Sequence, residues 1–147
     1  MAMYKHLLVP TDGSAVAAKA FQAAVTFASE AGAKITGYYA IEDMNMHHVG
    51  AHLTKELIEE FDRRAREVAE QHVAEIGKVA KAAGVPYDSI VSRVPRPHEG
   101  IIEAAGKCGA DIIFMASHGH RGLTGLIVGS VTQKVLTHST IPVLVFR

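Results

Sequence analysis

Short apolar runs alternate with amphipathic helical patterns along the whole chain. Strands that are apolar on both faces are typical of a parallel sheet covered by helices, and a regular β-α order predicts the same arrangement. We therefore predict an α/β fold with a single open, mostly parallel five-stranded sheet and helices on both faces. The expected strands are 4–9, 34–41, 89–94, 111–115 and 142–146, and the expected helices are 14–32, 54–83, 98–107 and 131–137.

Length and charge narrow the classes of protein further. A chain of 147 residues is the size of one domain, so residues 1–147 are expected to form a single domain. Its 15 basic residues match its 15 acidic ones, which gives no electrostatic reason to expect a nucleic-acid or membrane partner. The only cysteine, Cys108, suits a reducing compartment, and no apolar run approaches the ~20 residues of a membrane helix. We expect a soluble cytoplasmic protein.

Glycines cluster in the segment between the fourth predicted strand and the last predicted helix. Gly119, Gly122, Gly125 and Gly129 let the backbone approach a ligand closely, and the helix start that follows offers unpaired N–H groups with a partial positive charge. This order of strand, glycine-rich loop and helix favours phosphate binding. Neither the Walker lysine motif nor the Gly-x-Gly-x-x-Gly dinucleotide motif is present.

The predicted topology places a ligand in the same region. In an open parallel sheet, ligands bind beyond the carboxyl ends of the strands, where the strand order reverses. Three segments leave such ends: 10–14, 41–43 and the loop from Ala116 onward. The glycine-rich loop is therefore the expected site.

The spacing within this loop resembles that of the universal stress protein family. ATP-binding members carry Gly-x-x-Gly, nine residues, and then Gly-Ser or Gly-Thr. Here Gly119 is followed by nine residues and then by Gly129-Ser130, whereas Ala116 stands at the first glycine position. Segments 7–14, 97–102, 110–119 and 141–145 also resemble blocks of the family, so the resemblance covers essentially the whole chain.

The resemblance implies a Rossmann-like fold of the adenine nucleotide alpha hydrolase type that binds ATP, AMP or ADP, with or without Mg²⁺ or Mn²⁺. It implies that Asp12 meets the ribose hydroxyls, that the backbone near Ile41 reads adenine, and that N–H groups from Gly119 to Val131 hold phosphates. It also implies a homodimer formed through the last strand, Pro142 to Phe146. The full expected nucleotide-binding set is Pro10, Thr11, Asp12, Ile41, Met115, Ala116, His118, Gly119, Arg121, Gly122, Gly129, Ser130 and Val131.

Several residues keep two interpretations at this point. Asp12 either contacts a ribose or makes a turn at the start of the first helix. His118 and Arg121 either meet phosphate oxygens or face solvent. His72, on the apolar stripe of the second helix, is expected in the core or at a dimer edge. His47, His48 and His52 are expected in an exposed loop rather than in a metal site.

The expected function also has alternatives at this point. No catalytic motif stands out, so we expect a dimeric, ATP-binding stress-response protein that acts as a nucleotide-dependent regulator or interaction module. The alternatives are a slow ATPase, or a nucleotide-independent scaffold in which Ala116 has replaced a glycine that ATP requires.

Overall fold

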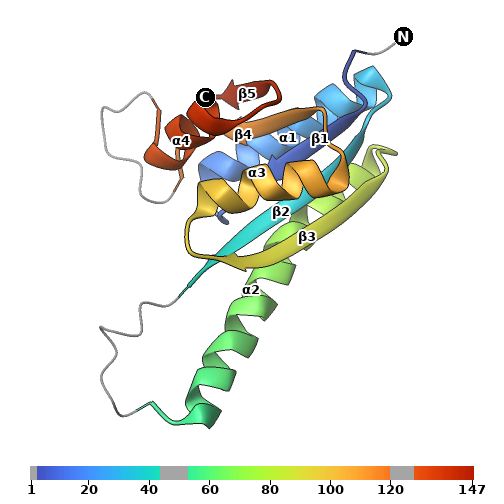
Figure 1. Ribbon diagram of the computed structural model, residues 1–147. Helices are drawn as coiled ribbons and strands as arrows, with labels where there is room; N and C mark the ends of the chain where they lie inside the picture. Colours follow the sequence, from blue (N-terminus) through green and yellow to red (C-terminus); the bar gives the residue numbers. More distant parts are fainter. Residues whose placement is uncertain (1–2, 44–52, 120–127) are drawn as a thin grey trace.

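The computed structural model describes residues 3–43, 53–119 and 128–147, and Figure 1 shows a twisted sheet with helices on both sides. All strand pairs in the order β3-β2-β1-β4-β5 are parallel, which confirms the predicted α/β fold. The strands are β1 (His6–Pro10), β2 (Lys34–Glu42), β3 (Tyr87–Val94), β4 (Ile112–Ala116) and β5 (Val143–Phe146). The helices are α1 (Ala15–Ala31), α2 (Lys55–Ala82), α3 (Pro97–Cys108) and α4 (Ser130–His138).

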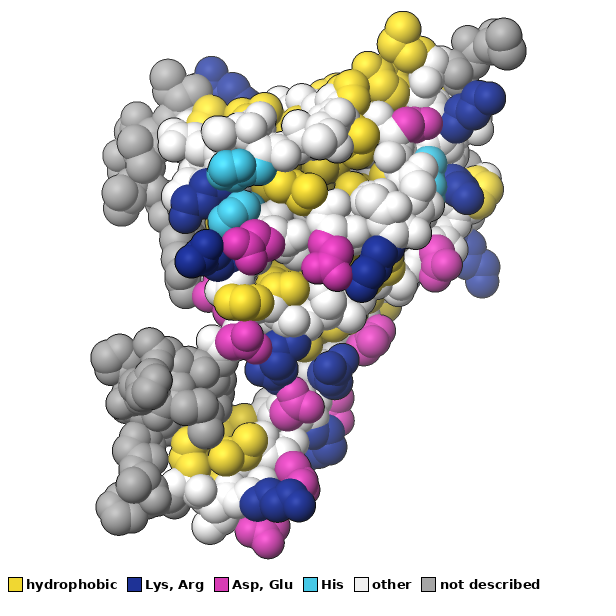
Figure 2. Space-filling model, in the orientation of Figure 1, with side chains coloured by type: hydrophobic (Ala, Val, Ile, Leu, Met, Phe, Trp, Pro, Cys, Tyr) yellow, Lys and Arg dark blue, Asp and Glu magenta, His cyan; other side chains and the backbone are white. Residues whose placement is uncertain are grey.

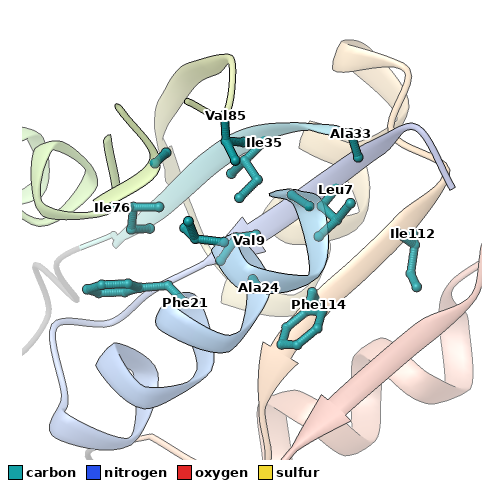
Figure 3. Packing of buried hydrophobic residues seen from close by; sticks show 13 residues of the cluster. Leu7, Val9, Phe21, Ala24, Ala33, Ile35, Ile76, Val85, Ile112 and Phe114 are labelled. Atoms are coloured by element: carbon teal, nitrogen blue, oxygen red, sulfur yellow. The ribbon is translucent and has the colours of Figure 1, made fainter. Parts of the chain in front are cut away.

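Each face of the sheet has its own apolar core. Leu7 and Val9 of β1 point into a cluster formed with α1 and α2 (Figure 3), whereas Leu8 points into a second cluster formed with α3 and α4. All three side chains have no solvent exposure. Because successive residues of a strand face opposite sides, a strand covered on both sides must be apolar throughout. This explains the unbroken apolar runs in the sequence.

The ends of the helices follow local capping chemistry. The hydroxyl of Ser14 accepts a hydrogen bond from the N–H of Ala17 at 3.1 Å, and Thr54 does the same for Leu57 at 3.2 Å. Gly32 ends α1 with φ of 67°, a left-handed conformation that glycine adopts without strain. The predicted boundaries of α1 and α2 are confirmed at these caps.

The apolar stripe of α2, which the spacing of Leu57, Phe61 and Val68 predicts to face the core, is exposed in its first half. Leu57, Phe61 and Val68 are 41%, 42% and 45% exposed, and the buried side chains of α2 are Ala69, Val73, Ile76 and Ala80. Figure 1 shows the reason, because the beginning of α2 projects beyond the sheet. Periodicity identifies an apolar stripe on a helix, but it does not reveal where the sheet beneath that helix ends.

The surface carries charges of both signs. Figure 2 shows basic and acidic side chains intermixed on one face, together with apolar side chains on the projecting part of α2. This mixture agrees with the balanced net charge of the sequence. Within the described ranges, no helix is long and apolar enough to span a membrane.

Candidate functional site

The strand order reverses beside β1. The chain leaves β1 through α1 on one face of the sheet and leaves the neighbouring β4 through a loop to α4 on the other face. Because the two connections diverge, the carboxyl ends of β1 and β4 mark the position where open parallel sheets bind ligands, and we call this position the crevice. The topology therefore brings segments 10–14, 116–119 and 129–131 to one edge of the sheet.

The turn after β1 is fixed by a short series of hydrogen bonds. The N–H of Thr11 donates to the carbonyl of Tyr38 at 2.9 Å, and the N–H of Gly13 donates to Thr11 Oγ1 at 3.1 Å. The N–H of Ser14 donates to Asp12 Oδ1 at 2.9 Å, so Asp12 makes the turn that the sequence left as one of its two interpretations. Only one oxygen of Asp12 takes part in this bond.

The second oxygen of Asp12 faces the other loop of the crevice. A Cβ added to Gly119 would collide with Asp12 Oδ2, so the carboxylate lies directly against the Cα of Gly119. A side chain at position 119 would prevent the carboxylate from lying there, which is a steric reason for glycine at this position. The contact joins the loop after β1 to the loop after β4 across the crevice.

The loop after β4 is anchored at both of its described ends. Ser117 donates its N–H to the carbonyl of Phe146 at 2.8 Å, and its own carbonyl accepts the N–H of Gly129 at 2.6 Å. The hydroxyl of Thr132 donates to the carbonyl of Ala116 at 3.0 Å. These bonds hold the start of α4 beside the end of β4. The N–H of Gly129 is thereby used within the protein.

The start of α4 is open on its other side. Gly129 is the N-cap residue, and no side chain within the described ranges caps this helix. Ser130 is exposed and Val131 is partly exposed at the first helical positions. The first N–H groups of a helix lack intrahelical partners and carry a partial positive charge. Residues 130 and 131 are therefore better placed than Gly129 to donate to an anion.

The remaining predicted residues differ in what they present to the crevice. Thr11, Ile41 and Ala116 are buried at 8%, 6% and 8% exposure. Met115 is 5% exposed, and its side chain packs in the core beneath α3 and α4, which leaves its backbone for any ligand. Partial exposure is found for Pro10, Asp12, His118 and Gly119.

Some sequence predictions fall elsewhere. Arg121 and Gly122 lie outside the described residues, as do His47, His48 and His52. Within the described ranges, no group of three His, Cys, Asp or Glu side chains could hold a metal ion.

Two aromatic side chains near the crevice were not predicted to belong to the site, and His72 was expected only in the core or at a dimer edge. The rings of Tyr39 and His72 are stacked with centroids 5.5 Å apart and planes 10° from parallel. A Cβ on Gly13 would lie 2.6 Å from His72 Nε2, so the ring lies against the turn that carries Asp12. Burial, together with the charges of Asp12 and Glu42, raises the pKa of the Tyr39 hydroxyl. No local pattern links these residues, because only the packing of α2 on β2 brings them together.

The universal stress protein family model matches residues 3–147. The chain belongs to the universal stress protein family. Universal stress protein MJ0531 of Methanocaldococcus jannaschii is 31% identical over 146 residues, covering 99% of this chain and 83% of the relative. The match includes the loops after β1 and β4, so family membership extends to the crevice.

Solved structures of universal stress proteins have the same architecture. Hypothetical protein MJ0577, solved as a test of structure-based functional assignment, has a TM-score of 0.82 and 32% identity, covering 97% of this chain and 95% of its own. A universal stress protein in complex with cAMP has a TM-score of 0.72 and 22% identity, covering 98% and 97%. A universal stress protein from Archaeoglobus fulgidus in complex with dAMP has a TM-score of 0.64 and 16% identity, covering both chains fully. The last two are similar to this chain in fold.

Proposed function

We propose that this universal stress protein binds an adenine nucleotide, ATP first among them, in the crevice between the loops after β1 and β4. The observation that carries this proposal is the contact of Asp12 with the Cα of Gly119, beside the open start of α4. A carboxylate suits ribose hydroxyls, and the N–H groups of a helix start suit phosphate oxygens. Solved members of the family that hold cAMP and dAMP support the same ligand class.

The residue roles follow from this position. Pro10, Thr11 and the backbone at Ile41 and Met115 would line the nucleoside side, with Asp12 on the ribose. Gly119, Ser130 and Val131 would face the phosphates, and the fixed backbone at Gly129 would hold the start of α4 in place. We extend the phosphate side to His118, Arg121 and Gly122, with the methyl of Ala116 at the back of the crevice.

The effect of the ligand is regulatory in this proposal. A nucleotide that binds the folded chain stabilises it. It also shifts the equilibrium of any complex in which the strands or loops around the crevice take part. We propose a homodimer paired through β5, whose side chains are all partly exposed. An exposed strand edge is a template for pairing with a second chain. We propose that residues 1–147 form one domain and that this domain works in the cytoplasm.

Isothermal titration with ATP, AMP and cAMP tests the proposal directly. We expect saturable heat for at least one adenine nucleotide and a rise in melting temperature with its concentration. Mass spectrometry of the small molecule that copurifies with the protein would identify the preferred one. If no binding heat is measured at millimolar nucleotide, the proposal is wrong and the protein is a nucleotide-independent scaffold.

Single-turnover incubation with ATP and Mg²⁺ or Mn²⁺ separates a regulator from an enzyme. Hydrolysis requires a group that positions the attacking water and cations that neutralise the developing charge. We expect ATP to remain intact for hours. Steady release of phosphate would instead support the slow ATPase.

A further inference from the structure

His72 of α2 lies beneath the turn that carries Asp12. The Cε1 and Nε2 edge of its ring faces Gly13, where an added Cβ would stand 2.6 Å from both atoms. Gly13 has φ of 83°, a left-handed conformation in which the backbone turns sharply between Asp12 and Ser14. The imidazole therefore fills the space into which this turn would otherwise relax.

The ring of His72 is itself held by packing rather than by polar contacts. Its opposite support is the ring of Tyr39, stacked at 5.5 Å from β2. The Nδ1 atom is buried and has no hydrogen-bond partner in the described part of the chain, and Glu75 Oε1 lies 3.8 Å away, too far for a hydrogen bond. The side chain as a whole is 25% exposed. The position is thus occupied by a flat ring that packs between Tyr39 and Gly13.

This stack connects α2 to the crevice in a continuous series of contacts. Tyr39 supports His72, His72 supports Gly13, and the adjacent Asp12 contacts Gly119 on the far loop. Asp12 is close enough to Tyr39 for its charge to raise the pKa of the Tyr39 hydroxyl, with burial as the larger cause. A displacement of the ring would therefore move the carboxylate as well.

We infer that His72 is a positioning residue, whose ring, supported by Tyr39, sets the Asp12–Ser14 turn in the geometry that the ligand meets. The inference deepens the proposed function, because the positioned group is the carboxylate proposed to bind ribose. It assigns a role to a side chain that does not itself contact the ligand.

Two substitutions separate the shape of the ring from its chemistry. H72F keeps a flat ring against Gly13 and Tyr39 but has no nitrogen, whereas H72A leaves the space empty. Y39L removes the support from the other side, so it provides a second test if H72A folds poorly. Q71A, at an exposed neighbouring position of α2, is the matched control.

The first readout needs no nucleotide. The N–H of Ser14 donates to Asp12 Oδ1, so its hydrogen exchange, measured by NMR on the whole protein, reports the turn. We expect exchange about tenfold faster in H72A and Y39L, and wild-type exchange in H72F and Q71A. The fully buried amides of Leu7 and Leu8 serve as the internal reference for global unfolding.

The second readout is discrimination between ATP and 2′-deoxy-ATP by calorimetry. A merely structural role would weaken both nucleotides equally, whereas a displaced Asp12 weakens ATP more. We expect H72A to lose discrimination and H72F to restore it. Unchanged Ser14 exchange in both H72A and Y39L, or failure of H72F to restore it, would overturn the inference. If the wild type binds no adenine nucleotide, the proposed function fails, while Ser14 exchange still decides the role of His72.

Discussion

The carboxylate of Asp12 lies against the Cα of Gly119, so the loops after β1 and β4 contact each other where a side chain is missing. These residues are distant in the chain, and only the pairing of β1 with β4 brings them together. The relationship makes position 119 sensitive to a single methyl group. It also means that the position of the Asp12 carboxylate depends on the position of Gly119.

Gly119→Ala should weaken nucleotide binding by about tenfold or more, roughly 1.4 kcal/mol, because the new methyl displaces the Asp12 carboxylate. Titration calorimetry with ATP measures the loss. Gly106→Ala is the matched control, since Gly106 of α3 has nothing within 4 Å of an added Cβ. Equal affinity of the two variants would show that the contact between Asp12 and Gly119 does not matter for the ligand.

Gly77→Ala should destabilise the fold, although alanine is normally preferred to glycine within a helix by about 1 kcal/mol. A Cβ at Gly77 would lie 2.6 Å from Cε1 of Tyr87, whose hydroxyl is anchored on the carbonyl of Val73. Overpacking of this kind costs about 1–3 kcal/mol, so the substitution should lower the free energy of unfolding rather than raise it. Urea denaturation measures the free energy of unfolding. Gly106→Ala, in open space on α3, should be neutral or stabilising in the same assay.

Acidification should lower the free energy of unfolding through His6. Its ring bonds to Thr36 Oγ1 at 2.7 Å, and burial, together with the charge of Lys34, lowers the pKa of the imidazole below its usual 6.5. The folded protein then binds this proton less readily than the unfolded chain. The full stability is present above pH 6.5 and is lost as the pH falls through the lower folded-state pKa.

Denaturation curves between pH 8 and pH 5, on the order of three units around the histidine range, measure this slope. His6→Gln should flatten it, since glutamine keeps a polar partner for Thr36 without titrating. His98, whose pKa burial also lowers, supplies part of the remaining slope. A slope that is identical in the wild type and in His6→Gln would contradict the assignment.

Val145→Pro should dissociate the proposed dimer while preserving the fold. Ile113 donates its N–H to Pro142 and Ser117 donates to Phe146, so the polar groups of Val143 and Val145 point to the open edge of β5. Proline removes an edge donor, and a position whose N–H faces away from the sheet tolerates it. Sedimentation velocity measures the mass. Val145→Thr keeps the N–H and should stay dimeric, and a dimer that survives Val145→Pro would exclude pairing through β5.

The fold could be predicted because its signals are local. The caps at Ser14 and Thr54 and the left-handed Gly32 define helix ends within a few residues of sequence. The unbroken apolar runs indicated strands that are buried on both faces of the sheet, and the two apolar clusters bury them. The buried face of α2 could not be predicted, because the point where the sheet ends depends on tertiary packing rather than on the spacing of Leu57 and Phe61.

The sequence predicts which loops form the candidate site, but it does not predict the residues that support them. Spacing identified Gly119 and Gly129, and the strand order placed them opposite Asp12. The engagement of the Gly129 N–H by Ser117 depends on how α4 returns to β4. The stack of Tyr39 on His72 depends on the packing of α2 against β2, and the sequence of neither segment indicates that the two rings meet.

The bond from the Ser117 N–H to the carbonyl of Phe146 makes one residue the neighbour of both the outermost strand and the glycine-rich loop. A partner that displaces β5 would therefore act through Ser117 on the loop that we propose to hold the nucleotide. Formation of the proposed dimer should then change nucleotide affinity, and nucleotide binding should change dimer affinity. Variants that separate the two effects are best sought at Ser117.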